Sequence, residues 1–178
     1  YFIDLGINGE HFSNKITTMP IDPSTSKEKI IDVQSPYAWA KGHSIFDYYI
    51  RNFAGVDPAD GRSTWTVYYQ DLNSNNSFDA GEQVTDLEAF YGTNPDKKGS
   101  LKTGTTKTYS QATLYYNDKS AIPDVRGAVN LRAGFKGFEL SVQTLYSFGG
   151  WSYDYAYAGL MANGAIGTNN WSTDIRRA

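Results

Sequence analysis

Apolar and polar residues alternate with a period of two along two neighbouring stretches, residues 128–135 and 138–148. Successive side chains of a β-strand point to opposite faces, so this alternation predicts two strands that each have one apolar face. One face carries Val129, Leu131, Ala133, Phe135, Phe138, Leu140, Val142, Thr144, Tyr146 and Phe148, and polar residues such as Asn130, Arg132, Glu139, Ser141 and Gln143 lie between them. Because only Lys136 and Gly137 separate the two runs, the pattern predicts a β-hairpin with a two-residue turn.

Three other segments have weaker strand patterns. Alternation is broken in residues 1–16, whereas residues 44–53 and 64–70 are rich in aromatic and β-branched side chains. Residues 55–61 (GVDPADG) lie between segments 44–53 and 64–70, and their Asp, Pro and Gly are typical of a tight turn. Together with the hairpin, these segments predict five strands, and residues 155–162 predict a short helix.

The connections between the predicted strands differ sharply in length. GVDPADG and Lys136-Gly137 are short, whereas residues 20–41 and 71–124 are long and polar. Short periplasmic turns and long extracellular loops are typical of outer-membrane β-barrels. Five strands would leave two open edges, which lipid does not tolerate, and bacterial barrels have an even number of strands from eight upward. We therefore expect an all-β fold, a partial transmembrane β-barrel with residues 71–124 as a long extracellular loop insertion.

Composition narrows the classes of function. Charged residues make up 20% of the 178 residues and the formal net charge is −3, so no basic surface is available for a nucleic-acid backbone. The chain has no cysteine, which excludes disulfides and thiol catalysis, and two histidines are too few for a histidine-rich metal site. No apolar run reaches the length of a transmembrane helix, but a barrel strand needs only about 9–11 residues. Residues 1–4 lack the features of a secretory signal, so we expect the chain to begin in mid-protein or after processing.

Several short motifs occur in an order that matches one known family. Residues 42–61 contain Gly-x-Ser-Ile-aromatic-Asp-aromatic-Tyr followed by Ala-Gly-Val-Asp-Pro-x-x-Gly. Asn-Lys-Ile-Thr at residues 14–17 precedes this stretch, and Ala-Ile-Pro at residues 121–123 follows it with Gly127. Residues 136–150 begin with Lys-Gly-Phe-Glu-Leu-Ser and end with Gly-Gly. In this combination the chain resembles the SusC/RagA-type TonB-dependent outer-membrane transporters.

The resemblance spans residues 14–174 and implies a late segment of a much larger protein. Residues 1–178 would then be part of a plugged barrel of about 22 strands in a Gram-negative, Bacteroidetes-like outer membrane. The implied function is TonB-energised import of a glycan or peptide, with a SusD-like surface lipoprotein as partner. Nothing in the sequence resembles the family's signal peptide, TonB box or plug, or the strands expected after residues 171–174. Residues 71–124 are longer than the usual family loop.

One motif inside this long polar segment has the spacing of a calcium-binding loop. In residues 71–82 (DLNSNNSFDAGE), oxygen-bearing side chains occupy positions 1, 3, 5, 9 and 12 of an EF-hand loop, and position 7 supplies a backbone carbonyl. The candidate Ca²⁺ ligands are Asp71, Asn73, Asn75, Ser77, Asp79 and Glu82. Asn76 stands at position 6, where glycine is usual, and asparagine is the next best residue for a left-handed backbone. The alternative is a solvated loop whose match is accidental.

Clustered aromatic residues have two interpretations. Trp151, Tyr153 and Tyr155, together with Tyr157, are candidates for a platform on which sugar rings stack at the mouth of the barrel. The alternative is a membrane-interface girdle or a loop core, because barrels place aromatic residues at both membrane boundaries. For the tyrosine pair at residues 68 and 69, at a predicted strand end, we expect the girdle.

No catalytic arrangement is apparent, and we expect a protein that is not an enzyme. His11 and His43 have no partnered nucleophile in sequence, and turn formation explains Asp57 and Asp60 better than acid–base catalysis. The alternative function is a soluble, calcium-stabilised β-sandwich that binds carbohydrate. The two functions differ in what covers the alternating apolar face, which is lipid in a barrel and protein core in a sandwich.

Overall fold

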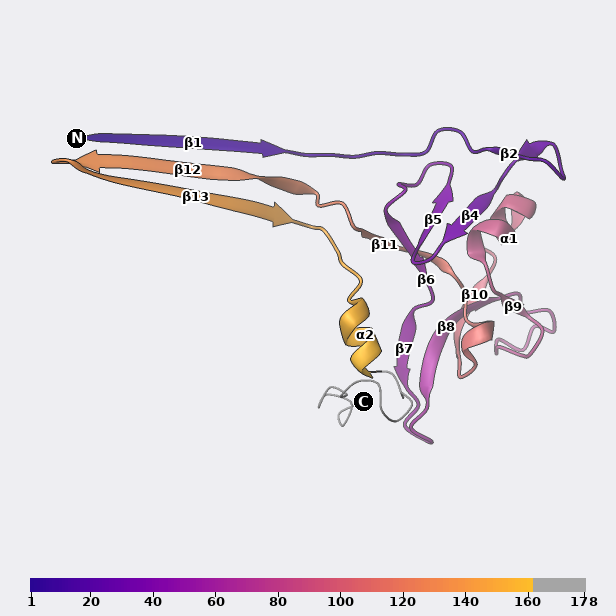
Figure 1. Ribbon diagram of the computed structural model, residues 1–178. Helices are drawn as coiled ribbons and strands as arrows, with labels where there is room; N and C mark the ends of the chain where they lie inside the picture. The colour runs from indigo at the N-terminus through magenta and orange to yellow at the C-terminus, as the bar shows by residue number, and fades with distance from the viewer. Residues whose placement is uncertain (162–178) are drawn as a thin grey trace.

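The computed structural model describes residues 1–161, and its regular structure is mostly antiparallel β-strand with a few short helices. The predicted all-β class is therefore confirmed. Figure 1 shows two parts, a long three-stranded sheet, named the arm here, and a compact part at one end of it. The sequence predictions for Ala162 and for residues 171–174 lie outside the described residues.

The arm is an open sheet whose middle strand pairs with a neighbour on each side. Its strands are β1 (Phe2–Glu10), β12 (Val125–Phe135) and β13 (Phe138–Phe148). Both pairings are antiparallel, and Leu131 of β12 lies opposite Leu5 of β1 and Val142 of β13. Side chains opposite one another lie on the same face, so the register decides which residues share a surface.

The predicted hairpin in the arm is confirmed. Strands β12 and β13 pair along their whole length, and only Lys136 and Gly137 separate them. These two residues have φ values of 48° and 83°. A type I′ turn requires left-handed backbone at both central residues, so the observed dihedrals suit a two-residue hairpin loop.

The compact part contains two four-stranded sheets and a small hairpin. The first sheet is β4 (Ile31–Gln34), β5 (Tyr37–Ala40), β6 (Asp47–Ile50) and β11 (Tyr115–Ser120), and the second is β7 (Phe53–Val56), β8 (Ser63–Tyr69), β9 (Gln83–Val84) and β10 (Lys102–Thr106). The small hairpin pairs β2 (Ile21–Asp22) with β3 (Lys27–Glu28). The helices are α1 (Leu87–Thr93) and α2 (Tyr155–Met161), and single 3₁₀ turns span Pro95–Lys97 and Tyr109–Gln111.

Buried polar groups with satisfied hydrogen bonds join the elements of the compact part. The Thr113 hydroxyl donates to the Val84 carbonyl at 2.5 Å and accepts from the Tyr68 N–H at 2.8 Å. The Tyr49 hydroxyl donates to Asp86 Oδ1 at 2.6 Å. Burial raises the pKa of Tyr49, so its hydroxyl keeps the proton that this bond needs. These bonds join β8 and β9 to the segment that precedes β11, and β6 to the N-terminus of α1.

The predicted number of five strands is wrong, because the described residues form thirteen. Residues 44–53 form β6 and the first residue of β7, and residues 64–70 belong to β8, so both segments lie in the compact part instead of extending the arm. The strand predicted in residues 1–16 ends at Glu10. The aromatic residues of these segments pack against each other within the compact part, which a pattern of sequence alone does not distinguish from packing in a barrel wall.

The two long connections contain most of the strands that the sequence did not predict. Residues 20–41 hold β2 to β5, and residues 71–124 hold β9 to β11 and α1. Strands of two to six residues are too short for alternation to be visible. The turn predicted at residues 55–61 is confirmed by the bond from the Gly61 N–H to the Asp57 carbonyl at 2.8 Å. It joins β7 to β8, far from the turn at the tip of the arm (Figure 1).

Gly127 is a position in the arm where a neighbouring backbone atom approaches closely. A Cβ atom there would lie 2.2 Å from the Asn8 carbonyl oxygen and 2.5 Å from the Tyr146 hydroxyl, which itself donates to that carbonyl at 2.9 Å. A backbone atom cannot rotate away as a side chain can. We therefore expect Gly127→Ala to lower the free energy of unfolding of the arm by about 1–3 kcal/mol, the usual cost of overpacking. Urea unfolding of the protein measures this difference.

Gly6 of β1 provides the matched control for Gly127. A Cβ atom at Gly6 would have its nearest neighbour, Asn130 Cβ, at 3.9 Å, which is ordinary van der Waals contact. Gly6→Ala should therefore change the free energy of unfolding by no more than about 0.5 kcal/mol. Equal losses in the two variants would show that the close approach at Gly127 does not determine the stability of the arm.

Candidate functional site

The two faces of the arm differ in chemistry, one being mostly apolar and the other mostly polar. The register places one set of apolar side chains on a single face, namely Ile3, Leu5, Ile7, Val125, Val129, Leu131, Ala133, Phe135, Phe138, Leu140, Val142, Tyr146 and Phe148. The opposite face carries Asp4, Asn8, Glu10, Arg126, Asn130, Arg132, Glu139, Ser141, Gln143 and Ser147. Phe2, Ala128 and Leu145 are the apolar residues of this polar face. The alternation read from the sequence thus continues across all three strands.

No described residues form a core against the apolar face of the arm. Ile7 is 70% exposed and Leu140 is 58% exposed. Every residue of β1 is exposed, and β13 has a single half-buried residue, Tyr146. Soluble monomers rarely expose a contiguous apolar surface of this kind, and larger patches mark contact with membrane or protein.

Aromatic residues stand at both ends of the apolar face. Phe135 and Phe138 lie opposite each other at the tip of the arm, and Tyr146 and Phe148 stack at 5.9 Å at its other end. An 11-residue strand is about 36 Å long and, at the tilt of about 40° usual in barrels, rises about 28 Å. An apolar band of about 25 Å between two aromatic girdles is the pattern of outer-membrane barrels.

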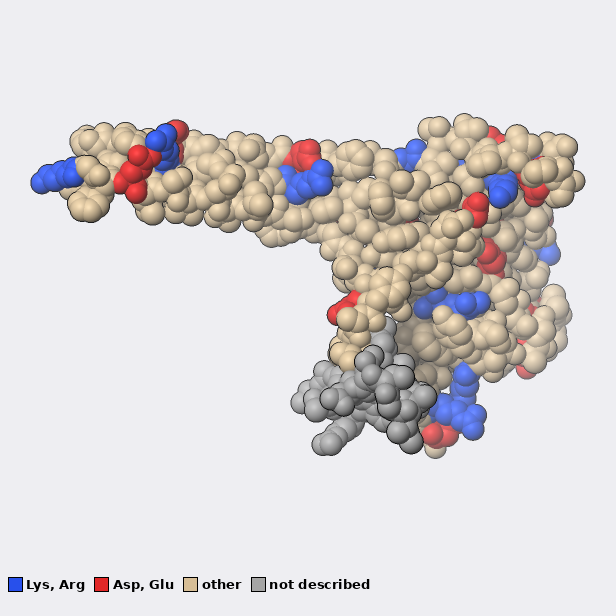
Figure 2. Space-filling view, viewed as in Figure 1, with Lys and Arg blue, Asp and Glu red and all other residues tan. Residues whose placement is uncertain are grey.

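The polar face of the arm is crossed by ion pairs. Arg126 of β12 pairs with Glu10 of β1, and Arg132 of β12 pairs with Glu139 of β13. Figure 2 shows acidic and basic side chains next to each other along the visible face of the arm, with a basic group at its tip. Such pairs neutralise charge on this face, whose side chains would be costly to place in lipid.

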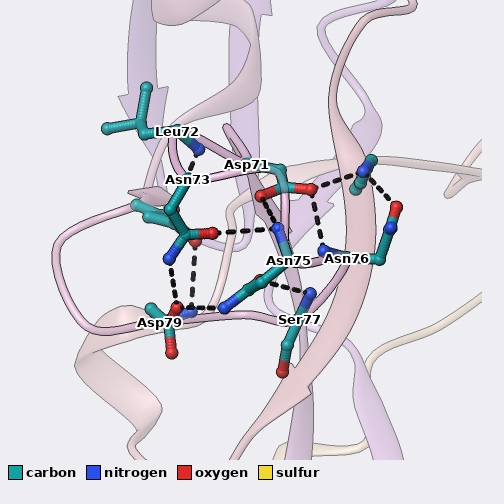
Figure 3. A network of polar contacts seen from close by, with 9 residues as sticks. Asp71, Leu72, Asn73, Asn75, Asn76, Ser77 and Asp79 are labelled. Carbon is teal, nitrogen blue, oxygen red and sulfur yellow. Dashed lines mark hydrogen bonds and ion pairs between the residues drawn. The ribbon is translucent and has the colours of Figure 1, made fainter.

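The predicted calcium loop folds into a network of polar contacts (Figure 3). The Asn73 and Asn75 amide groups donate to Asp79 Oδ2 at 2.8 and 2.7 Å. Asp71 accepts from the backbone N–H groups of Asn75 and Asn76, and Asn76 has a φ of 59°. The predicted left-handed backbone at position 6 is thus confirmed. The side chains of Asn73, Asn75 and Asp79 therefore meet at one side of the loop.

Glu82 and Lys102 complete the loop from opposite directions. The Glu82 carboxylate accepts from the Leu72 and Asp79 backbone N–H groups at 2.9 and 3.2 Å. The Lys102 ammonium of β10 donates to Asp71 Oδ2 and to Asn76 Oδ1, both at 2.5 Å, and lowers the pKa of Asp71. Sequence reasoning missed Lys102, which lies 31 residues beyond Asp71 and joins the loop only because β10 pairs with β8.

The donor types of this loop fit a hard cation, which prefers carboxylate, amide and backbone oxygens. Within the described residues, however, no three His, Cys, Asp or Glu side chains meet in the arrangement of a metal centre. The Asn73 and Asn75 amides present nitrogen to Asp79. Calcium binding therefore requires these amides to turn their oxygens inward and replace the bonds that now close the loop.

The aromatic residues after β13 are exposed but do not form one flat surface. Trp151 is 52% exposed and has the Lys119 ammonium 3.3 Å from its ring centroid. The rings of Tyr153 and Tyr155 lie 4.5 Å apart, tilted by 58°. The Tyr48 hydroxyl donates to the Trp151 carbonyl and accepts from the Tyr153 N–H, so β6 positions this segment. Tyr157 lies in α2.

The remaining residues of interest have structural roles. Tyr69 is buried against Phe78, so the girdle expected there is wrong and Tyr69 belongs to the core of the compact part. Tyr68 is half-buried and contacts Tyr115 edge to face at 5.2 Å. His43 stacks on Tyr116 at 3.7 Å, and His11 bonds a backbone carbonyl. Asp57 and Asp60 both bind Lys107, whose ammonium lowers the pKa of each carboxyl. None of these contacts joins a nucleophile to a base.

None of the described helices has the length and apolar character needed to cross a bilayer. Comparison with known protein families, with curated proteins and with solved structures found no match to this chain. A proposal for function therefore rests on the geometry of the arm, of the loop of residues 71–82 and of the compact part.

Proposed function

We propose that the arm is a membrane-spanning piece of an outer-membrane β-barrel and that the chain is a segment of a SusC/RagA-type nutrient importer. The arm itself is the observation that carries this proposal. Its three long strands have an exposed apolar face bounded by aromatic residues and a polar face crossed by ion pairs. Lipid on one side and water on the other satisfy both faces at once.

The open edges of the arm support its place in a larger sheet. β1 and β13 each have one edge that pairs with no described strand. Unpaired N–H and C=O groups are not tolerated in lipid, so neighbouring strands would have to continue the sheet on both sides. This requirement favours a closed barrel over an isolated three-stranded sheet.

The compact part lies at the end of the arm opposite the short turn (Figure 1). Under the proposal it is built from extracellular connections and stands at the mouth of the barrel. Its exposed surfaces, including Trp151, Tyr153 and Tyr155, would be available to a glycan or peptide nutrient or to a SusD-like lipoprotein. Energy would come from the TonB complex acting on a plug, and no enzymatic step is proposed.

The alternative, a soluble carbohydrate-binding β-sandwich, has less support. In a sandwich the apolar face of the arm would pack on a second sheet, and no described residues cover it. The compact part lies beyond the end of the arm, not over its face (Figure 1).

Subcellular fractionation with mass spectrometry of the native polypeptide tests the proposed function. We expect the sequence in the outer-membrane fraction, within a polypeptide on the order of 100 kDa, the scale of a plugged barrel of about 22 strands. A stable 19.8 kDa species in the soluble fraction would rule out the importer and favour the sandwich.

We also propose that the loop of residues 71–82 binds Ca²⁺ and so rigidifies the compact part. Chymotrypsin cleavage after Phe78 should slow by about tenfold when Ca²⁺ replaces EDTA, because the ion stabilises only the folded loop. Asp71→Ala combined with Glu82→Ala should abolish this protection, whereas Asp96→Ala, an acidic residue outside the loop, should retain it. If the parent protein is cleaved at the same rate with Ca²⁺ as with EDTA, the calcium proposal is wrong.

A further inference from the structure

A pocket of about 380 Å³ lies where the polar face of the arm meets the compact part. Its walls include Phe12, Tyr37, Phe46 and Pro123, and Glu10 and Arg126 of the arm line it as well. An apolar cavity of about 150 Å³ holds a benzene molecule, so this pocket, named the junction pocket, has room for a fused two-ring group. A second hollow, on the arm, also includes Glu10 and Arg126, so the ion pair lies between the two.

Aromatic side chains give the junction pocket its apolar walls. Phe12 is 50% exposed and Phe46 is 39% exposed, so both present ring surface to solvent. Tyr37 contacts Phe46 edge to face at 6.5 Å and stacks on Tyr48 at 5.0 Å. These contacts hold the Tyr37 and Phe46 rings in place and leave flat apolar surface that a ligand can cover.

The charged groups at the junction pocket leave one guanidinium edge available. Arg126 uses Nε to bind Glu10, and its two Nη groups have no hydrogen-bond partner among the described residues. Its side chain is 59% exposed. The edge of an arginine that carries two parallel N–H groups matches the two oxygens of a carboxylate. Because the Nε contact to Glu10 holds the guanidinium in place, its Nη edge is oriented to bind a second anion.

The other polar wall of the pocket is uncharged at neutral pH. Hydrogen bonding to Tyr48 and burial raise the pKa of Tyr37 to about 12. Its phenol therefore adds no negative charge to the site, and Arg126 neutralises the Glu10 carboxylate. An incoming anion meets no net negative charge from these three residues.

We propose that the junction pocket binds small aromatic acids, with the ring between Phe12, Tyr37 and Phe46 and the carboxylate on the Nη edge of Arg126. As a substrate subsite this inference rests on the proposed import function, because Glu10 and Arg126 lie on the face assigned there to the lumen. Binding itself depends only on the pocket. The chemistry selects against neutral sugars, which have no group for the guanidinium and little flat apolar surface.

Calorimetric titration of the purified protein with 2-naphthoate tests the proposal, with 2-naphthylmethanol as the neutral analogue. We expect 2-naphthoate to bind at least about tenfold more tightly, because only the acid can form a charge-assisted bidentate pair with the guanidinium. Arg126→Gln should remove this preference, and Arg126→Lys should retain only part of it. Phe46→Ala should lower the affinity for both ligands alike, and Glu10→Gln should raise the affinity for 2-naphthoate only.

Arg132→Gln is the matched control, because Arg132 also lies in β12 and pairs with a glutamate but is not among the residues lining the pocket. The Arg132→Gln variant should bind 2-naphthoate with the same affinity as the parent protein. Equal affinities for the acid and the alcohol, or equal behaviour of the Arg126→Gln and Arg132→Gln variants, would overturn the inference. Selective binding by a protein absent from the outer membrane would uphold the pocket and refute the importer, so the two failures are distinguishable.

Discussion

Replacing Leu131 by arginine is expected to cost about 2–4 kcal/mol of folding free energy in a bilayer, the cost of a cation at the midplane of a barrel wall. Leu131 lies in the middle strand between Leu5 and Val142, near the centre of the apolar face. The new guanidinium would have to reach an interface past aliphatic neighbours on both sides. Urea titration of the protein folded into phosphatidylcholine vesicles measures the loss.

Asn130→Arg is the control for this experiment, because Asn130 is the next residue of β12 and points to the polar face. It lies opposite Gly6 and Gln143, so a larger polar side chain has both room and water. We expect a change of no more than about 0.5 kcal/mol. Equal losses at residues 130 and 131 would mean that the two faces of the arm do not meet different solvents.

The second large effect is expected in the compact part, where Thr113→Val should lower the free energy of unfolding by about 2–4 kcal/mol. Thr113 is fully buried, and its hydroxyl satisfies both the Val84 carbonyl and the Tyr68 N–H. Valine has nearly the same shape but removes the hydroxyl from both backbone groups, and a buried group left unsatisfied costs about 1–3 kcal/mol. Thermal or urea unfolding of the compact part reports the difference.

Thr105→Val in β10 controls for the change of residue type. Thr105 is exposed, and no hydrogen bond of its side chain is found among the described residues. Its replacement should be neutral or slightly stabilising, because β-branched residues favour strands. A loss at residue 105 as large as that at residue 113 would show that the buried hydroxyl is not what stabilises this region.

The hairpin of β12 and β13 could be predicted from sequence because everything that specifies it is local. Alternation over 11 residues selects the faces, and the Lys136-Gly137 turn fixes the register. The left-handed backbone of Asn76 was predictable for the same reason, since the residue types of the motif itself favour it.

The rest of the fold depends on contacts between distant segments. β1 pairs with β12 across more than 100 residues, and no local pattern in residues 2–10 identifies that partner. Short strands such as β4 and β9 are held by pairing and burial, not by their own sequence pattern. The junction pocket could not be predicted from sequence for the same reason, because Phe12, Tyr37 and Phe46 meet Arg126 only in the folded chain.

The central claim is that the arm separates lipid from water, and site-directed cysteine labelling tests it most directly. The chain contains no cysteine, so single substitutions of Leu140, Ser141, Val142 and Gln143 in β13 can each be labelled alone in the reconstituted protein. We expect labels at 140 and 142 to be quenched by nitroxide lipids, and cysteines at 141 and 143 to react with a water-soluble maleimide. Four positions with the same behaviour, or a reversed alternation, would contradict a membrane-spanning arm.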